Sequence, residues 1–382
     1  MTAPTAAGSG VGPEPGSESA ASELHGILET VATAAPGPAV ATVALRADES
    51  ATLCEGAAPD TRFELGSVTK TFTALLLAVM AERGEVRLDA PIGAHLPGPL
   101  LPEGHGDRIT LTHLATHTSG LPRLPPGLML AALPRWYTNP YETFTPGRLL
   151  RALPRTRVRR PPGTRVRYSN FGVGLLGRLL ADAAGTDYAE ALADRVLEPL
   201  GLTDTTCDPT LPQATGHLRG RPRPPWLIPG LPGAGALRSS ARDTERYLTA
   251  LLSPPPTVDA ALRTALYEVT RPRVAEPGGD LVCLVWKRRA LPADDGGTHH
   301  LLFHSGGTRG FTSFVGFSPT ARTALAALSN GSPTLRATFI RTAYRALRGL
   351  TVQAPTRPPS APDVRGVDDP APEHRAVRSP DA

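Results

Sequence analysis

Ser67 and Lys70 are the two side chains whose types and spacing are best suited to chemistry. They lie three positions apart in Gly66-Ser67-Val68-Thr69-Lys70, so on a helix they would share one face. Lysine is otherwise rare, since the chain has 38 arginines and Lys287 is its only other lysine. Arginine keeps its proton in a protein, whereas a buried lysine amine can become neutral and accept one. Lys70 is therefore a candidate base beside a hydroxyl nucleophile, and Lys287 is interpreted as a surface residue.

The segments around Ser67 predict how it is held. Residues 39–45 and 51–55 are strand-like runs joined by a short polar segment, which is typical of a β-hairpin. After Ser67, apolar side chains recur at helical spacing until Gly84. Ser67 is thus expected at the first turn of a helix, with Lys70 one turn further on the same face.

The remainder of the chain predicts an α+β fold with an antiparallel sheet assembled from both chain ends. Two helical patterns occupy 171–184 and 187–200. Strand-like runs follow at 281–286, 301–304, 311–317 and 323–329. A closing amphipathic helix is expected from one apolar stripe, formed by Leu335, Phe339, Ala343, Ala346 and Leu350.

Composition indicates a soluble globular protein with ample core. Of its 382 residues, 40% are hydrophobic and 20% are charged. The net charge of +5 is modest for this length, so neither nucleic acid nor a membrane is expected as a partner. The three cysteines lie far apart, without zinc-ligand spacing or a disulfide framework, and neither metal nor cofactor is expected.

Domain limits and location follow from the two ends of the chain. Residues 1–21 are expected to form a disordered leader, 22–351 the folded domain, and 352–382 a disordered tail rich in Pro, Arg and Asp. The leader has no basic n-region and no apolar run, so it does not resemble a secretory signal. With no stretch long enough to cross a bilayer, a cytoplasmic location is expected.

Two further polar clusters lie at predicted element edges. One is Tyr168-Ser169-Asn170, just before the predicted helix at 171–184, and the other is His304-Ser305-Gly306-Gly307, at the end of a strand. Taken singly, each cluster is only weak evidence for a functional site. Tyr-x-Asn before a helix is compatible with a helix cap, and His-x-Gly-Gly is compatible with a turn at the end of a strand. A site built from several segments would draw its residues from such edges.

Taken in order, the three clusters and the residues around them resemble the serine β-lactamase and penicillin-binding-protein superfamily. Within it, they resemble the class C β-lactamase-like esterase and peptidase branch. The resemblance spans roughly residues 38–350. The matching stretches are Phe63-Glu64-Leu65-Gly66-Ser67-Val68-Thr69-Lys70, Leu111-Thr112-His113-Leu114-Ala115-Thr116-His117-Thr118-Ser119-Gly120-Leu121-Pro122, Tyr168-Ser169-Asn170-Phe171-Gly172, Gly233-Ala234-Gly235-Ala236-Leu237 and His304-Ser305-Gly306-Gly307.

This resemblance implies a β-lactamase/transpeptidase-like fold. Its antiparallel sheet would be flanked by helices, in an α/β subdomain formed by residues 22–90 and 235–351. An all-helical subdomain, about 91–234, would be inserted between them, with the active site in the cleft.

The resemblance also implies roles for individual residues. Ser67 would be the nucleophile that takes an acyl group, and Lys70 and Tyr168 would relay protons. Asn170 would orient Lys70 and the substrate. Gly306 would leave space for substrate beside the strand, and the amide of Gly307 would join that of Ser67 in an oxyanion hole.

His304 departs from the pattern of true β-lactamases, which usually have lysine at this position. A lysine holds a permanent charge for a substrate carboxylate, whereas histidine is near neutral at pH 7. The sequence therefore favours a serine hydrolase acting on a small-molecule ester or amide. The alternatives are a D-amino-acid peptidase, a weak β-lactamase, or a non-hydrolytic acyl-binding sensor or acyltransferase.

Three other patterns are given structural interpretations. Gly172-Val173-Gly174-Leu175-Leu176-Gly177 fits a dinucleotide fingerprint, but a polar segment precedes it, and close helix packing explains it better. His113 and His117 have zinc-compatible spacing without a third ligand, and a structural role is favoured. The arginine-rich segment 148–167 is interpreted as solvated surface, with the alternative that Arg159 and Arg160 lie over the Tyr168 cleft and select acidic substrates.

Overall fold

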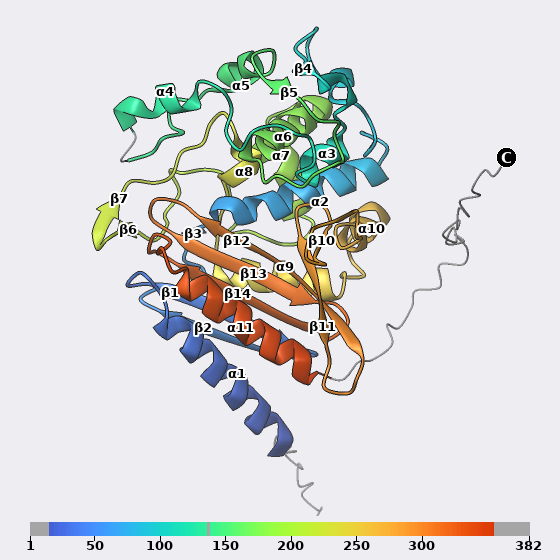
Figure 1. Cartoon of the computed structure of the whole chain (residues 1–382). Coiled ribbons are helices and arrows are strands. Elements are labelled where there is room, and N and C mark those ends of the chain that lie inside the picture. The colour runs from blue at the N-terminus through green and yellow to red at the C-terminus, as the bar shows by residue number, and fades with distance from the viewer. Residues whose placement is uncertain (1–14, 136–137, 355–382) are drawn as a thin grey trace, which may run out of the picture.

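An eight-stranded antiparallel sheet forms the centre of the protein (Figure 1). The computed structural model describes residues 15–135 and 138–354. The strand order is β2-β1-β14-β13-β12-β11-β10-β9. The bounds are β1 Val40–Arg46, β2 Glu49–Glu55, β9 Val274–Ala275, β10 Leu281–Val282, β11 Lys287–Pro292, β12 Thr298–Gly307, β13 Thr312–Ser318 and β14 Thr323–Ser329.

Strands from the N-terminal and C-terminal parts of the domain pair directly within this sheet. β1 pairs with β2 on one side and with β14 on the other, in a register that runs from Val40 opposite Ser329 to Arg46 opposite Thr323. β13 and β14 are buried along their whole length, which requires cover on both faces of the sheet. The predicted α+β class, with a sheet assembled from both chain ends, is confirmed.

Helices supply that cover (Figure 1). α1 (Pro15–Thr33) and α11 (Thr338–Gln353) pack on one face, and α9 (Ala241–Leu252) packs on the other. Along β14, Leu325 and Ala327 join the apolar cluster under α1 and α11. Ala326 and Leu328 face the opposite way, into the larger core shared with α9.

Residues 91–235, between the two parts of the sheet, form the inserted region, and the large core continues into it through α2 (Thr69–Glu82). It also contains two pairs of short strands. Its helices are α3 Leu111–Ala115, α4 Leu128–Ala132, α5 Pro146–Ala152, α6 Asn170–Ala184, α7 Tyr188–Leu192 and α8 Pro232–Gly235. The strand pairs are β4 Glu103–Gly104 with β5 Arg157–Val158, and β6 Gly216–Leu218 with β7 Arg221–Arg223.

Close packing of α6 accounts for the glycine pattern at its start. A Cβ added to Gly177 would lie 3.0 Å from the Cα of Gly233 on α8, and one added to Gly174 would collide with Leu231. The segment before α6 is not a strand, so the context that a dinucleotide site needs is missing from this described part of the chain. α10 (Ala260–Glu268) also packs against α2.

The structure differs from the predicted leader boundary, because α1 begins at Pro15 and so includes residues 15–21. The cause is burial further along the helix, where Leu24, Leu28 and Val31 are fully enclosed. Once that stripe is anchored, the preceding segment continues the helix, and proline is tolerated in its first turn. The rest of the leader and most of the tail lie outside the described residues. Among the described residues, no helix is long and apolar enough to span a bilayer.

Other boundaries differ from the prediction for local reasons. The run at 281–286 forms strand only at β10, because Val285 has a φ of 57° and donates its N–H to the carbonyl of Ala115. Leu335 is fully exposed and precedes α11, whose N-cap Ala337 is left-handed. β11, α9 and α10 have no counterpart among the predicted elements.

Replacing Leu28 on α1 tests whether this helix belongs to the folded domain. Leu28→Ala removes a fully buried side chain, so we expect the free energy of unfolding to fall by about 2–4 kcal/mol in urea denaturation. Glu29→Ala, on the exposed face of the same helix, should change it by less than about 0.5 kcal/mol. Equal effects of the two substitutions would show that α1 does not contribute to the core.

Candidate active site

Ser67 lies in a short 3₁₀ turn, Gly66–Val68, that leads directly into α2. Its side chain does not cap the helix, since the N-cap residue Val68 has no side-chain cap bond. The Ser67 Oγ instead accepts hydrogen bonds from Lys70 Nζ at 3.0 Å and from the Tyr168 hydroxyl at 2.7 Å. It faces a cavity of about 590 Å³ between β12 and the inserted region. Tyr168 lies 101 positions after Ser67, and the fold brings it to the Ser67–Lys70 pair.

Lys70 is completely buried and has a carbonyl, not a carboxylate, as its second partner. Its Nζ donates to the oxygen of Ala234 on α8 at 2.7 Å. Removal from water lowers the pKa of Lys70 well below its usual range, and the nearby charge of Arg123 lowers it further. A neutral amine is therefore accessible at this position, and the same 3.0 Å contact then allows Ser67 to donate to it.

Tyr168 stands immediately before α6, whose N-cap is Ser169. Its ring centroid lies 4.6 Å from that of His117 and 6.4 Å from that of His304, and the Arg123 guanidinium lies 5.5 Å away. Burial raises the pKa of Tyr168 to about 12, against smaller lowering effects of its bond to Ser67 and of Arg123. The phenol is thus protonated near neutral pH, in the state that donates to Ser67.

His117 holds the segment around Tyr168 in place. Its carbonyl accepts the N–H of Arg167 at 2.7 Å, and its Nδ1 accepts the N–H of Ser169 at 3.3 Å. Its backbone is left-handed, with a φ of 59°, which is uncommon for a residue with a side chain. Burial lowers the pKa of His117 well below its usual range, so the ring is neutral.

The other histidine of this segment is also used structurally. His113 completes the capping box of α3, because its Nδ1 accepts the backbone N–H of the N-cap residue Thr110 at 3.1 Å. In the parts of the chain that the structure describes, no group of three or more His, Cys, Asp or Glu side chains could hold a metal.

The end of β12 packs against the turn that presents Ser67. A Cβ added to Gly306 would collide with the oxygen of Leu65 and lie 2.9 Å from the nitrogen of Ser67. One added to Gly66, whose φ is +50°, would lie 2.7 Å from the nitrogen of Gly307. Glycine is therefore needed at both positions for strand and turn to approach. The approach places Ser67 and Gly307 at one wall of the cavity.

His304 also lines the cavity, and its side chain is uncharged. Burial and the neighbouring Lys70 lower its pKa to about 3, although a hydrogen bond to the Ser305 carbonyl opposes the shift. Its Nδ1 lies 2.9 Å from that carbonyl oxygen and so carries the ring hydrogen. At pH 7 His304 therefore presents no positive charge to a substrate.

Asn170 does not orient Lys70 in this structure. Its Nδ2 donates to the Tyr141 hydroxyl at 3.2 Å, while its buried Oδ1 has no partner among the described residues. The Ala234 carbonyl takes the place at Lys70 that was predicted for Asn170.

Two cations that were not predicted as site residues line the cavity, Arg123 and Lys287. Lys287 is held by Glu276 at 2.9 Å and Asp280 at 3.1 Å. Arg123 is exposed and has no carboxylate within salt-bridge distance among residues 15–135 and 138–354. Of the segment 148–167, only Val166 lines the cavity, so Arg123, and not Arg159 or Arg160, is the arginine over the Tyr168 cleft.

Comparison with known proteins agrees with this geometry. The family model described as Beta-lactamase matches residues 35–350. The chain belongs to the Beta-lactamase family. Two solved structures share the β-lactamase fold. A class C β-lactamase from Rhodobacter sphaeroides superposes with a TM-score of 0.70 at 24% identity, covering 85% of this chain and 97% of that one. A β-lactamase/D-alanine carboxypeptidase from Pseudomonas syringae superposes with a TM-score of 0.71 at 24% identity, covering 85% of this chain and 99% of that one.

Curated relatives of this Beta-lactamase family member match over part of their length. D-alanyl-D-alanine-carboxypeptidase/endopeptidase AmpH of Escherichia coli K12 is 31% identical over 202 residues, which is 51% of this chain and 50% of AmpH. Protein flp of Staphylococcus aureus MW2 is 25% identical over 284 residues, covering 72% of this chain and 54% of flp. The chain thus spans about half the length of these relatives. The expected membership of the serine β-lactamase and penicillin-binding-protein superfamily is confirmed.

Arginine at position 70 tests whether this site needs an amine that can lose its proton. Lys70→Arg keeps the charge but cannot supply a neutral base, so we expect phosphonylation of Ser67 by a fluorophosphonate probe to slow by about 10²–10⁴. Circular dichroism establishes that the variant is folded. Labelling at the unaltered rate would exclude Lys70 as the base.

Replacing Arg123 tests its effect on Lys70. Arg123 helps to lower the pKa of Lys70. Because a base must be deprotonated to act, the rate of Ser67 phosphonylation should rise with pH, along an acid limb whose midpoint is the pKa of Lys70. In Arg123→Gln the pKa of Lys70 rises, and we expect this limb to move to higher pH. Arg123→Lys retains a charge and should stay nearer the parent profile. A shift in the opposite direction would contradict the assignment.

Proposed function

We propose that this protein is a serine hydrolase that cleaves a small-molecule ester or amide through an acyl-enzyme on Ser67. The observation behind the proposal is the contact of the Ser67 Oγ with both Lys70 and Tyr168. Lys70 is fully buried there and has no carboxylate partner among the residues that the structure describes. The nucleophile Ser67, the buried base Lys70 and the neutral proton donor Tyr168 meet at one wall of the cavity. Membership of the Beta-lactamase family supports the same reaction class.

In the first half of the proposed reaction, neutral Lys70 takes the proton of Ser67 while the Oγ attacks the substrate carbonyl. The backbone amides of Ser67 and Gly307 stabilise the oxyanion that forms, a contribution typically worth about 10²–10³ per donor. The proton passes through Tyr168 to the leaving alcohol or amine, and the C–O or C–N bond breaks. Ser67 is left acylated and Lys70 is neutral again.

In the second half, water attacks the acyl-enzyme. The Lys70–Tyr168 pair takes the proton of the water and returns one to the Ser67 Oγ as the acid product leaves.

We favour an ester or simple amide over a β-lactam because of His304. With a pKa of about 3, this residue is neutral at physiological pH and cannot hold a carboxylate as the lysine of true β-lactamases does. A D-amino-acid peptidase is the second candidate, since exposed Arg123 offers a cation in the same cavity and the relative AmpH is named a carboxypeptidase/endopeptidase.

The direct test compares the protein with Ser67→Ala on p-nitrophenyl butyrate, a chromogenic cephalosporin and a D-alanyl-D-alanine peptide. We expect ester hydrolysis that Ser67→Ala lowers by at least about 10³, with little cephalosporin cleavage. Intact-mass analysis of a quenched reaction should show a butyryl adduct on Ser67.

The outcomes separate the alternatives. Peptide cleavage exceeding ester cleavage would replace the esterase assignment with the peptidase. A stable adduct without turnover would indicate an acyl-binding sensor. Transfer of the acyl group to an added alcohol would indicate an acyltransferase. Ester hydrolysis unaffected by Ser67→Ala would overturn the mechanism.

A further inference from the structure

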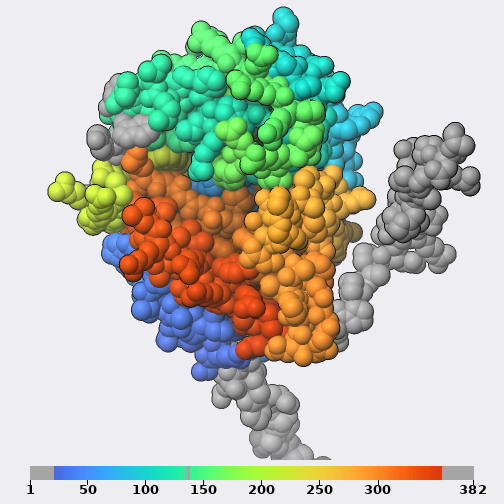
Figure 2. Space-filling view, in the orientation of Figure 1, coloured from blue at the N-terminus to red at the C-terminus, as the bar shows by residue number. Residues whose placement is uncertain are grey.

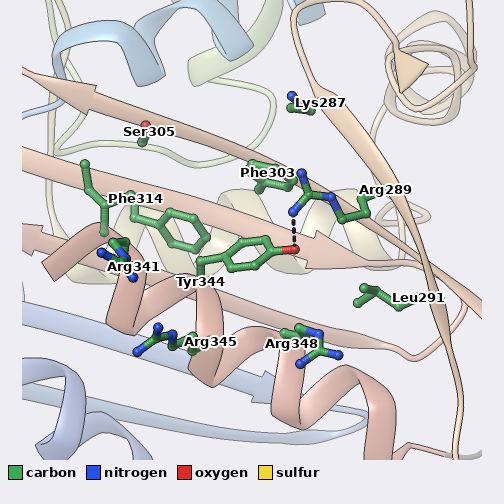
Figure 3. A pocket seen from close by; sticks show the side chains of 11 residues that line it. Lys287, Arg289, Leu291, Phe303, Ser305, Phe314, Arg341, Tyr344, Arg345 and Arg348 are labelled. Carbon is green, nitrogen blue, oxygen red and sulfur yellow. Dashed lines mark hydrogen bonds between the residues drawn. The ribbon is translucent and has the colours of Figure 1, made fainter. Parts of the chain in front are cut away.

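A second cavity, of about 660 Å³, adjoins the catalytic cavity on the face of the sheet that carries α11 (Figure 3). The two share four lining residues, so the catalytic cleft continues into a groove between α11 and strands β11 to β13. The shared residues are Lys287, Phe303, Ser305 and Ile340. We call the second cavity the α11 groove; its remaining lining residues are Arg289, Leu291, Phe314, Arg341, Tyr344, Arg345 and Arg348.

The floor of the α11 groove is apolar and preformed. The rings of Phe303 and Tyr344 meet edge to face at 5.0 Å, and the Arg289 guanidinium lies 5.5 Å from each ring. Arg289 is fixed in turn by the Tyr344 hydroxyl at 2.8 Å and by both oxygens of Asp280, at 2.8 and 2.7 Å. Figure 3 shows Tyr344 and Phe314 between the helix and the strands. Such a surface can take an apolar chain without rearrangement.

The rim of the groove has an excess of positive charge. Lys287 and Arg289 are neutralised by Glu276 and Asp280. Three exposed arginines on α11, Arg341, Arg345 and Arg348, have no carboxylate within salt-bridge distance in the described parts of the chain. In the space-filling view α11 lies at the surface beside the strands (Figure 2).

The junction of the two cavities and the far part of the α11 groove are lined by different side chains. Of the four residues that line both cavities, Phe303 and Ile340 are apolar, Ser305 is polar, and Lys287 is paired with Glu276 and Asp280. Arg345 and Arg348 line only the α11 groove. A ligand that reaches from Ser67 into this groove passes Phe303 and Ile340 where the cavities meet. Beyond them it reaches guanidinium groups that have no carboxylate partner within the described parts of the chain.

We propose that the α11 groove binds an anionic group, carboxylate or phosphate, that the substrate carries at the end of an apolar arm. This inference rests on the proposed hydrolase function and specifies its substrate class as esters or amides with such an arm. Arginine matches either anion, since its planar fork binds oxyanions in pairs of hydrogen bonds. In this arrangement the anion is bound in the α11 groove, so His304 is not required to carry a positive charge that binds it.

The test compares p-nitrophenyl octanoate with the mono-p-nitrophenyl ester of suberic acid, which differs from it by a terminal carboxylate. We expect the double variant Arg345→Gln/Arg348→Gln to lower the ratio of kcat/KM for the carboxylate ester to that for the octanoate by roughly two- to twentyfold, as for two exposed ion pairs. The parent ratio should also fall as salt is added. Arg108→Gln, an exposed arginine of the inserted region, removes a charge away from the groove and should retain the parent ratio.

A ratio that the double variant leaves unchanged, or that Arg108→Gln lowers equally, would overturn the proposal. Binding of octyl phosphate to Ser67→Ala, measured by calorimetry, tests the groove without turnover and probes phosphate in place of carboxylate. We expect it to weaken severalfold in the arginine double variant. If neither ester is hydrolysed but this arginine-dependent binding is found, the groove stands and the proposed hydrolase function fails. If esters are hydrolysed without arginine dependence in either assay, only the groove inference fails.

Discussion

Lys70 is enclosed by the protein and hydrogen bonded to a serine hydroxyl and a backbone carbonyl, and the geometry around Ser67 depends on this arrangement. A buried ammonium with a carboxylate partner would stay charged, whereas one without such a partner favours its neutral form. α2 places the amine one turn from Ser67, and α8 supplies the carbonyl of Ala234. Lys287 shows the contrast: burial alone would lower its pKa, but hydrogen bonds to Glu276 and Asp280 raise it.

Much of the site could be predicted because its residues occur in short motifs. Ser67, Lys70, Tyr168, His304 and Gly307 all line the cavity or contact the nucleophile, and each lies in a cluster recognisable in the sequence. The partners between clusters could not be predicted. The acceptor at Lys70 is a main-chain oxygen, which any residue type supplies. Arg123 is one of 38 arginines, and nothing local distinguishes it from those on the surface.

The fold was predictable where the hydrophobic pattern and the backbone agree. β14 occupies the predicted residues 323–329, because an uninterrupted apolar run suits a strand covered on both faces. In the run at 281–286 the strand ends after β10, because the backbone of Val285 is left-handed and its N–H bonds to the carbonyl of Ala115 instead of a neighbouring strand. α1 was underestimated because its first turns are small and polar, and only packing of Leu24 and Leu28 further on explains its length.

The joining of the two chain ends in one sheet has a consequence for synthesis on the ribosome. Ala39, just before β1, is bonded to Asn330, just after β14, 291 positions later. At about 5–20 residues per second, the β1–β2 hairpin therefore waits tens of seconds for the strand that covers its edge. During that time its apolar face and unpaired backbone are open to wrong partners. Loop closure over such a separation favours slow folding, and a nascent chain of this architecture is a natural client for chaperones that shield unfinished sheets.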